Sequence, residues 1–234
     1  MRRLLPSLRM RWRGRSFRLP RAWSNRLLRG IGPLVRGEVV NVSGWRDEDK
    51  QGRRYRDYFP NASSYTVTNH AGDRGLADSE DVTDLALDLT GPLDPALAGR
   101  FDVVFSHTTL EHVFEVEMAF ANLCRLSRDL VIVVLPFAQE VHHEASYGDY
   151  WRFTPMGLRA LFERNGLEVV FEGASPYRNA GIYLLFAGSR TPGRWRAELP
   201  AWSPVEVLGG WIGTTWPQRL RHSLRRGRSD LEVR

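Results

Sequence analysis

Short apolar runs alternate with helix-like segments through the middle of the chain, and this alternation constrains the fold more than any other feature. We predict five strands from these runs, at residues 38–43, 65–68, 85–89, 101–106 and 130–135. The last run, LVIVVL, is continuously apolar, as is typical of a strand buried on both faces. Strands that alternate with helices predict a parallel sheet covered on both sides.

Two helices are predicted from side-chain spacing and from capping residues. Apolar residues recur at spacings of three and four between the fourth and fifth strands, at Val113, Val116, Phe120 and Leu123. A second helix is expected to begin after Thr154, a good N-cap followed by Pro155, and to end near Asn165-Gly166. Both helices fit the crossover connections of an α/β sheet.

Two further strands, at 167–171 and 182–187, follow the second helix with a short link that favours antiparallel pairing. The fold class is therefore α/β, with a doubly wound, mostly parallel seven-stranded sheet and an antiparallel edge pair. In such sheets ligands bind beyond the carboxyl ends of the strands. That rule selects the segments 44–54, 69–73, 107–112 and 136–152 as the expected binding crevice.

Charge divides the 234 residues into three parts. Residues 1–36 hold 11 Arg and no acid, residues 37–190 hold 14 basic and 23 acidic residues, and residues 191–234 hold 8 basic and 4 acidic residues. We expect a basic N-terminal arm (1–36), one domain (37–190) and a Trp/Arg-rich C-terminal extension (191–234). The arm is expected to bind an anionic membrane rather than to shape the domain, and the alternatives are nucleic acid or simple solubilisation.

Membrane insertion and disulfide bonding are not expected. No apolar run approaches the roughly 18 residues of a spanning helix, and no signal-peptide pattern follows the basic N-terminus. Cys124 is the single cysteine, which suits a reducing compartment. The expected location is the cytoplasm, with peripheral membrane contact through the arm left open.

Two motifs carry a resemblance to a known family. The stretch FDVVFSHTTLEHVFEVEMAFANLCRLSRDLVIVVLPF (101–137) contains the turn Leu110-Glu111-His112, and GDYWRFTPMGLRALFERNGLEVV (148–170) opens the following helix. Together they resemble the class I S-adenosylmethionine-dependent methyltransferases, especially the bacterial type 11-like branch. The resemblance covers about residues 37–190 and implies the Rossmann-like methyltransferase fold with S-adenosylmethionine as cofactor.

The resemblance also implies a set of cofactor-binding residues. Six positions match: Ser43, Gly44, Asn69, Asp88, Ser106 and His107. The motif is degenerate, because only Gly44 remains of the usual glycine turn, Asn41 replaces an acid, and Asn69 replaces the carboxylate that would bind the ribose hydroxyls. An amide is a poorer bidentate acceptor than a carboxylate, so Asn69→Asp is expected to tighten cofactor binding.

The loop after the fifth strand, at 139–152, concentrates the candidate catalytic residues: His142, His143, Asp149 and Arg152. One histidine could act as a base near neutral pH, with Asp149 and Arg152 fixing the loop or the substrate. An alternative is an ordered lid without proton transfer. No metal site is expected, because the His pair lacks a third ligand at useful spacing.

The expected function is a methyltransferase that acts on a small molecule or glycan. One alternative is a catalytically inactive methyltransferase-like scaffold, favoured by Ser43 and Asn69. Another is an Arg-rich nucleic-acid-binding protein, against which the acidic middle of the chain argues. Glu111 and His112 could touch cofactor or substrate, or could simply hold the first turn of a helix.

Overall fold

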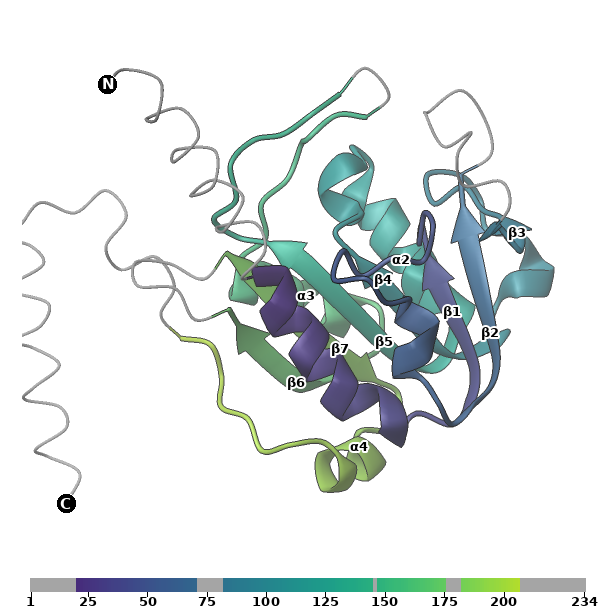
Figure 1. The fold of residues 1–234 in the computed structure, drawn as a ribbon, viewed down its shortest axis with the longest axis vertical. Helices are drawn as coiled ribbons and strands as arrows, with labels where there is room; N and C mark the ends of the chain where they lie inside the picture. The colour runs from purple at the N-terminus through teal and green to yellow at the C-terminus, as the bar shows by residue number, and fades with distance from the viewer. Residues whose placement is uncertain (1–19, 71–81, 145–146, 176–181, 207–234) are drawn as a thin grey trace, which may run out of the picture.

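The sheet has seven strands in the order β3-β2-β1-β4-β5-β7-β6. The computed structural model describes residues 20–70, 82–144, 147–175 and 182–206 (Figure 1). Strands β1 to β5 pair in parallel, whereas β7 runs antiparallel to both β5 and β6. This is the predicted fold class, a mostly parallel sheet with an antiparallel pair at one edge.

The strands agree closely with the predicted runs. They are β1 (Gly37–Val42), β2 (Ala62–Asn69), β3 (Leu85–Ala86), β4 (Phe101–His107), β5 (Ser127–Pro136), β6 (Glu168–Ala174) and β7 (Tyr183–Ser189). Residues 130–135 of β5 are almost completely buried, as expected of a central strand flanked by β4 and β7. β3 is shorter than predicted, because only its first two residues pair with β2.

The helices are α2 (Val116–Leu126), α3 (Pro155–Arg164) and α4 (Pro192–Glu198), with short turns η1 (Gly32–Leu34), η2 (Tyr55–Tyr58), η4 (Pro95–Leu97) and η5 (Leu110–His112). Thr154 caps α3 as predicted, since its Oγ1 accepts from the Gly157 N–H at 3.1 Å. Val113 lies before α2 rather than in it, because the separate turn η5 intervenes after β4.

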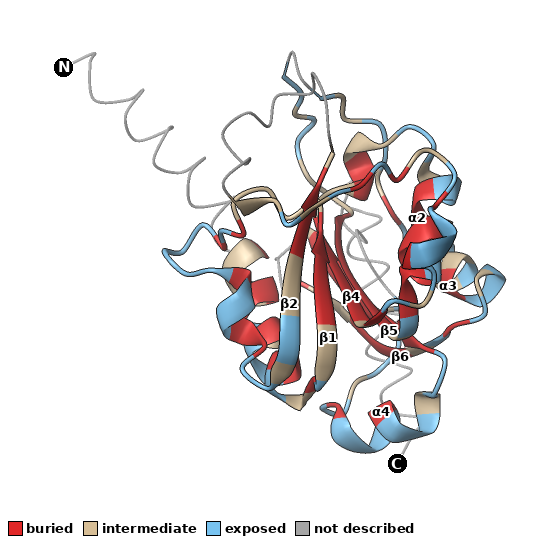
Figure 2. Ribbon diagram, turned by 90° about the vertical axis from the view of Figure 1, so that its right-hand side faces the viewer, coloured by how far each residue is buried: buried red, intermediate tan, exposed pale blue. Residues whose placement is uncertain are grey.

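Two apolar layers cover the sheet. Helices α2 and α3 pack on one face, where Phe120 and Phe162 meet edge to face (Figure 2). The other face is covered by a helix over residues 20–31, drawn in purple in Figure 1, together with η2 and α4. The sheet is therefore doubly wound.

Residues 20–36 differ from the expected free arm. Leu28, Ile31 and Val35 are almost completely buried in the second layer, because their apolar side chains cover a sheet face that would otherwise meet water. The start of the C-terminal extension is also packed, with Trp195 buried and its Nε1 donating to Asp129. Residues 1–19 and 207–234, with Trp211 and Trp216, lie outside the described residues.

Within the described part of the chain, no helix has both the length and the apolar character needed to cross a bilayer.

Candidate functional site

A cavity of about 650 Å³ opens where the parallel strands end. The arrowheads of β1 and β2 in Figure 1 point toward this side. Residues that follow each of β1 to β5 line it: Ser43, His70, Leu87, Asp88, Leu89, Thr90, Thr108, Thr109, His112, Val113, His143, Glu144, Tyr147, Gly148, Asp149 and Tyr150. Three of the four predicted segments, 69–73, 107–112 and 136–152, therefore contribute to one cavity, whereas no residue of 44–54 lines it.

The turn after β1 brings Ser43, but not Gly44, to the cavity wall. Ser43 and Trp45 adopt left-handed backbone angles, with φ of 54° and 49°. Gly44 is needed for close packing, because a Cβ there would lie 2.5 Å from Asn41 Nδ2. Asn41 in turn donates to Asp47 Oδ1 at 2.9 Å. The single remaining glycine thus serves the packing of the turn.

Asn69 holds this turn and does not line the cavity. Its Oδ1 accepts from the Trp45 N–H at 2.7 Å, and its Nδ2 donates to the Trp45 carbonyl at 3.0 Å and to Thr83 Oγ1 at 2.8 Å. Every hydrogen-bonding group of the amide is therefore engaged within the protein. The structure gives Asn69 a task that a carboxylate, which has no donor, would perform poorly.

Asp88 lines the cavity and is about half exposed. Its Oδ1 accepts from both the N–H and the hydroxyl of Thr90 at 2.7 Å, and its Oδ2 lies 3.8 Å from His70 Nε2. The carboxylate thus shapes a local turn and also faces the crevice. This position is compatible with the cofactor-binding role that the resemblance implies for Asp88.

Ser106 and His107 end β4 and point to opposite faces of the sheet, as successive strand residues must. Ser106 is buried without a hydrogen-bond partner for its Oγ, and it does not line the cavity. His107 packs under the helix at 20–31, where its Nε2 is 3.0 Å from Ser24 Oγ. Burial, followed by the charge of Arg21, lowers the pKa of His107 well below its ordinary value.

The loop after β5 places two of its four candidate residues on the cavity wall, His143 and Asp149. Asp149 forms a two-pronged ion pair with Arg152, at 2.5 and 2.6 Å, and accepts from the His142 N–H at 2.7 Å. The side-chain hydrogen bond from Arg152 lowers the pKa of Asp149 to about 2. Arg152 also donates to the carbonyls of Gln139 and Glu140, so the pair closes the loop on itself.

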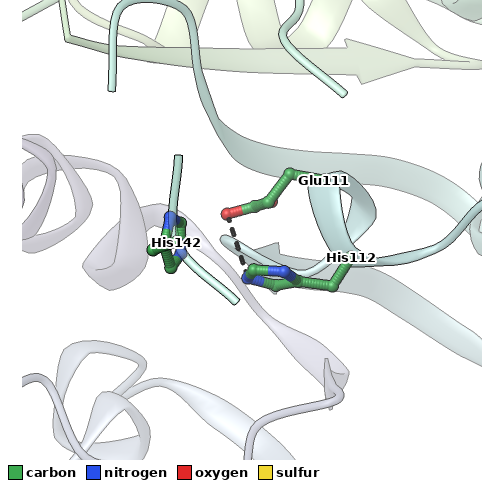
Figure 3. A group of neighbouring side chains, drawn as sticks. All are labelled: Glu111, His112 and His142. Atoms are coloured by element: carbon green, nitrogen blue, oxygen red, sulfur yellow. Dashed lines mark ion pairs between the residues drawn. The ribbon is translucent and has the colours of Figure 1, made fainter. Parts of the chain in front are cut away.

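His142 does not line the cavity, and its imidazole lies beside Glu111 and His112 (Figure 3). One ligand atom from each of these three side chains lies within 4.8 Å of the others. Glu111 and His112 therefore give His142 two neighbours that could ligate a metal, which was not expected from the sequence, whereas His143 lies outside this group. The partners come from η5, which lies about 30 residues earlier in the chain but next to the loop in space.

Glu111 is the residue whose environment the sequence did not reveal. Its side chain is 0% exposed, neither carboxylate oxygen has a hydrogen-bond partner, and burial raises its pKa to about 8. Burial also lowers the pKa of the neighbouring His112. Sequence position could have identified Glu111 and His112, because both lie shortly after β4, in the segment 107–112 where ligands are expected.

Comparisons with known proteins identify the fold. No protein-family model and no curated protein matches the chain. Among solved structures, an S-adenosylmethionine-dependent methyltransferase from Mesorhizobium loti matches with a TM-score of 0.52 at 13% identity, over 70% of this chain and 95% of that one. The 1,6-didemethyltoxoflavin-N1-methyltransferase of Burkholderia thailandensis, with bound 1,6-didemethyltoxoflavin and S-adenosylhomocysteine, matches with a TM-score of 0.50 at 21% identity, over 72% and 80%.

The strand order, the antiparallel edge pair and these neighbours agree with one another. The chain has the Rossmann-like fold of the class I S-adenosylmethionine-dependent methyltransferases.

Proposed function

We propose that this protein is an S-adenosylmethionine-dependent methyltransferase, of the type 11-like branch, that acts on a small molecule or glycan. The observation that carries the proposal is the cavity, to which the segments after all five parallel strands contribute. The Burkholderia neighbour supports it, since that enzyme holds both a demethylated cofactor and a small acceptor. The volume of about 650 Å³ suits ligands of this size.

The residues on the wall fit the cofactor in part. Asp88 presents a carboxylate to the cavity beside Leu87 and Leu89, which suits an adenine ring with an exocyclic amino group between apolar side chains. Ser43 adds a turn with left-handed backbone next to the same space. Asn69, by contrast, is occupied with Trp45, so the ribose would lack its usual acidic partner.

The cofactor, when bound, supplies a methyl group on a positively charged sulfur. His143 lines the cavity and would accept the proton of an acceptor hydroxyl, whose oxygen then bonds to the methyl carbon. His143 would then release this proton to solvent. The Asp149–Arg152 pair keeps this loop in place, and positioning supplies much of the rate in such reactions.

Calorimetric titration with S-adenosylmethionine and S-adenosylhomocysteine tests the proposal. We expect binding, and about tenfold weaker binding in Asp88→Asn if one hydrogen bond to a charged group is lost. Asp94→Asn is a matched control, because Asp94 also accepts from the N–H two residues on, at Ala96, but does not line the cavity. Absence of binding heat in the wild-type protein would refute the proposal.

A non-catalytic scaffold is the second candidate. One observation favours it. Asn41 and Asn69 stand at the two positions where the family has acids, and both side chains are hydrogen-bonded within the protein. This candidate predicts no titration signal with either cofactor form and no methyl transfer to any acceptor.

We further propose that the basic N-terminal residues bring the protein to anionic surfaces. Residues 20–36 pack against the sheet, so this task would fall to residues 1–19, which hold seven Arg. Salt-sensitive binding to anionic vesicles should be lost when residues 1–19 are removed. Stronger binding to nucleic acid than to vesicles would instead favour the nucleic-acid alternative.

A further inference from the structure

We propose that Glu111, His112 and His142 form a binding site for a divalent transition-metal ion, best matched by Zn²⁺, next to the cavity that His112 lines (Figure 3). The three side chains come from two segments, the turn η5 and the loop after β5. Two imidazoles and one carboxylate are a donor set that holds Zn²⁺ while leaving a coordination position open.

The first argument is the state of Glu111. Its carboxylate is completely buried, and neither oxygen accepts a hydrogen bond. The closest ion-pair contact is His112 Nε2, at 3.8 Å from Oε1, which is too long for a hydrogen bond. A buried carboxylate without partners is costly, and a cation between Glu111 and the two imidazoles would remove that cost.

The second argument is the orientation of the imidazoles. His112 Nδ1 lies 2.6 Å from the Gly148 carbonyl, and His142 Nδ1 lies 3.2 Å from the Glu140 carbonyl. A carbonyl oxygen only accepts, so each ring must donate from Nδ1, and the neutral ring then keeps its lone pair on Nε2. Metal-ligating histidines typically hold their second nitrogen in this way, because the contact fixes both tautomer and ring direction.

The third argument is spacing. Ligand atoms around Zn²⁺ at about 2.0–2.2 Å stand roughly 3.3 Å apart in a tetrahedral site. Here the atoms lie within 4.8 Å of one another, and one pair is already at 3.8 Å. Side-chain rotations of His142, whose segment is a loop rather than a helix or strand, would close the remaining gap.

Asp149 positions His142 and is not a fourth ligand. Both of its oxygens are engaged by Arg152, and Oδ2 also accepts from the His142 N–H. His112, with Tyr147 and Gly148, lines the cavity. Of the three proposed ligands, His112 is the one that lines the cavity, so the site adjoins the space in which the acceptor would lie.

The role of the metal rests on the proposed methyl transfer, although the site itself does not. A divalent cation at this place would bind the acceptor oxygen and lower the pKa of its hydroxyl, which eases proton loss to His143. The acceptor class that follows is a hydroxyl compound able to coordinate the metal, such as a phenol, a catechol or a sugar diol.

Titration of the full-length, chelator-treated protein with Zn²⁺, and with Co²⁺ as a spectroscopic probe, tests the site. We expect one equivalent to bind, to raise the Tm, and to give Co²⁺ visible absorption bands of nitrogen–oxygen ligation. Glu111→Gln and His142→Ala should each weaken binding by at least about 100-fold, since even indirect partners of metal ligands cost 10–100-fold. His143→Ala, which alters the adjacent histidine outside the cluster, should bind as the wild type does.

Equal binding by wild-type protein, Glu111→Gln and His142→Ala would overturn the site, as would loss of binding in His143→Ala alone. Circular dichroism of each variant shows whether it is folded, so that a folding defect is not mistaken for a loss of metal affinity. S-adenosylhomocysteine titration of the same samples separates the two proposals. Metal binding without cofactor binding refutes the methyltransferase and keeps the metal site, and the reverse result refutes the metal site alone.

Discussion

His107 and His112 lie five residues apart at the same edge of the sheet, and their surroundings are opposite. His107 belongs to a closed ring of hydrogen bonds with Ser24, Arg21 and Thr108. The Arg21 guanidinium donates to Thr108 Oγ1, the Thr108 hydroxyl to Nδ1, Nε2 to Ser24 Oγ, and the Ser24 hydroxyl to the Arg21 carbonyl. The neutral ring that this pattern requires agrees with the lowered pKa of His107.

On the other side, His112 meets Glu111, whose two oxygens have no hydrogen-bond partner, and His142, whose loop closes over the cavity. A buried histidine with both nitrogens satisfied needs nothing further and holds the fold together. A buried carboxylate with nothing to bind, set between two imidazoles, is what a ligand or a metal ion would complete. The difference separates a part of this edge whose polar groups are paired within the protein from the part in which we propose a binding site.

Removing the cover over His107 should have the largest effect. A chain that begins at Gly37 lacks Leu28, Ile31 and Val35, and burial of each such side chain contributes about 1.5–3 kcal/mol. The sum is comparable with the whole stability of a typical domain, so we expect no cooperative thermal unfolding. A chain that begins at Pro20 is the matched control and should unfold cooperatively. A well-folded Gly37 chain would show that the helix at 20–31 is dispensable.

Apolar substitutions on the two sides should have effects of opposite sign. His107→Leu breaks the closed ring and leaves Thr108 and Ser24 with lost partners, so we expect a loss of about 1–3 kcal/mol. Glu111→Met removes a buried group without partners and should stabilise the metal-free protein by a similar amount. Urea unfolding in the presence of a chelator measures both. Destabilisation by Glu111→Met would mean that the carboxylate has partners in solution.

Acid should lower the stability of the protein through His107 over a defined range of pH. Below about 6.5 the unfolded chain protonates His107, whereas the folded protein keeps it neutral, so the free energy of unfolding falls by up to about 1.4 kcal/mol per pH unit. Above pH 6.5 this contribution is constant. His107→Gln should remove this part of the pH dependence of the free energy of unfolding. The contributions of all other titratable groups are the same in both proteins and cancel when the two curves are subtracted. Parallel stability curves for the two proteins between pH 7.5 and 5.5 would contradict it.

The smallest effect is expected at Asn69. Its amide is hydrogen-bonded within the protein, whereas the Asp88 carboxylate lines the cavity. Asn69→Asp loses the donor to Trp45 and sets a carboxylate against that carbonyl, so we expect a loss of about 1 kcal/mol and weaker cofactor binding. This reverses the expectation from the family pattern. Calorimetry with S-adenosylhomocysteine decides it, because tighter binding would restore the ribose role of this position.

Local signals in the sequence were sufficient for the elements and for the place of the site. The apolar run at 130–135, the Thr154 cap and the turn at Asn165-Gly166 each reflect a preference that short-range physics sets. Strand alternation then located the crevice, because parallel strands end at one edge of the sheet. His143 was found in this way, whereas Ser43 and Asp88 were expected from the family resemblance, and all three line the cavity.

Tertiary structure alone decided which partners meet. The charge pattern assigned residues 20–36 to an arm, although Leu28 and Ile31 among them cover the sheet. Periodicity reports that a side chain is buried, but it does not name what buries it. Glu111 and His142 are 31 positions apart, so their meeting depends on the path of the loop after β5 and on the Asp149–Arg152 pair that closes it.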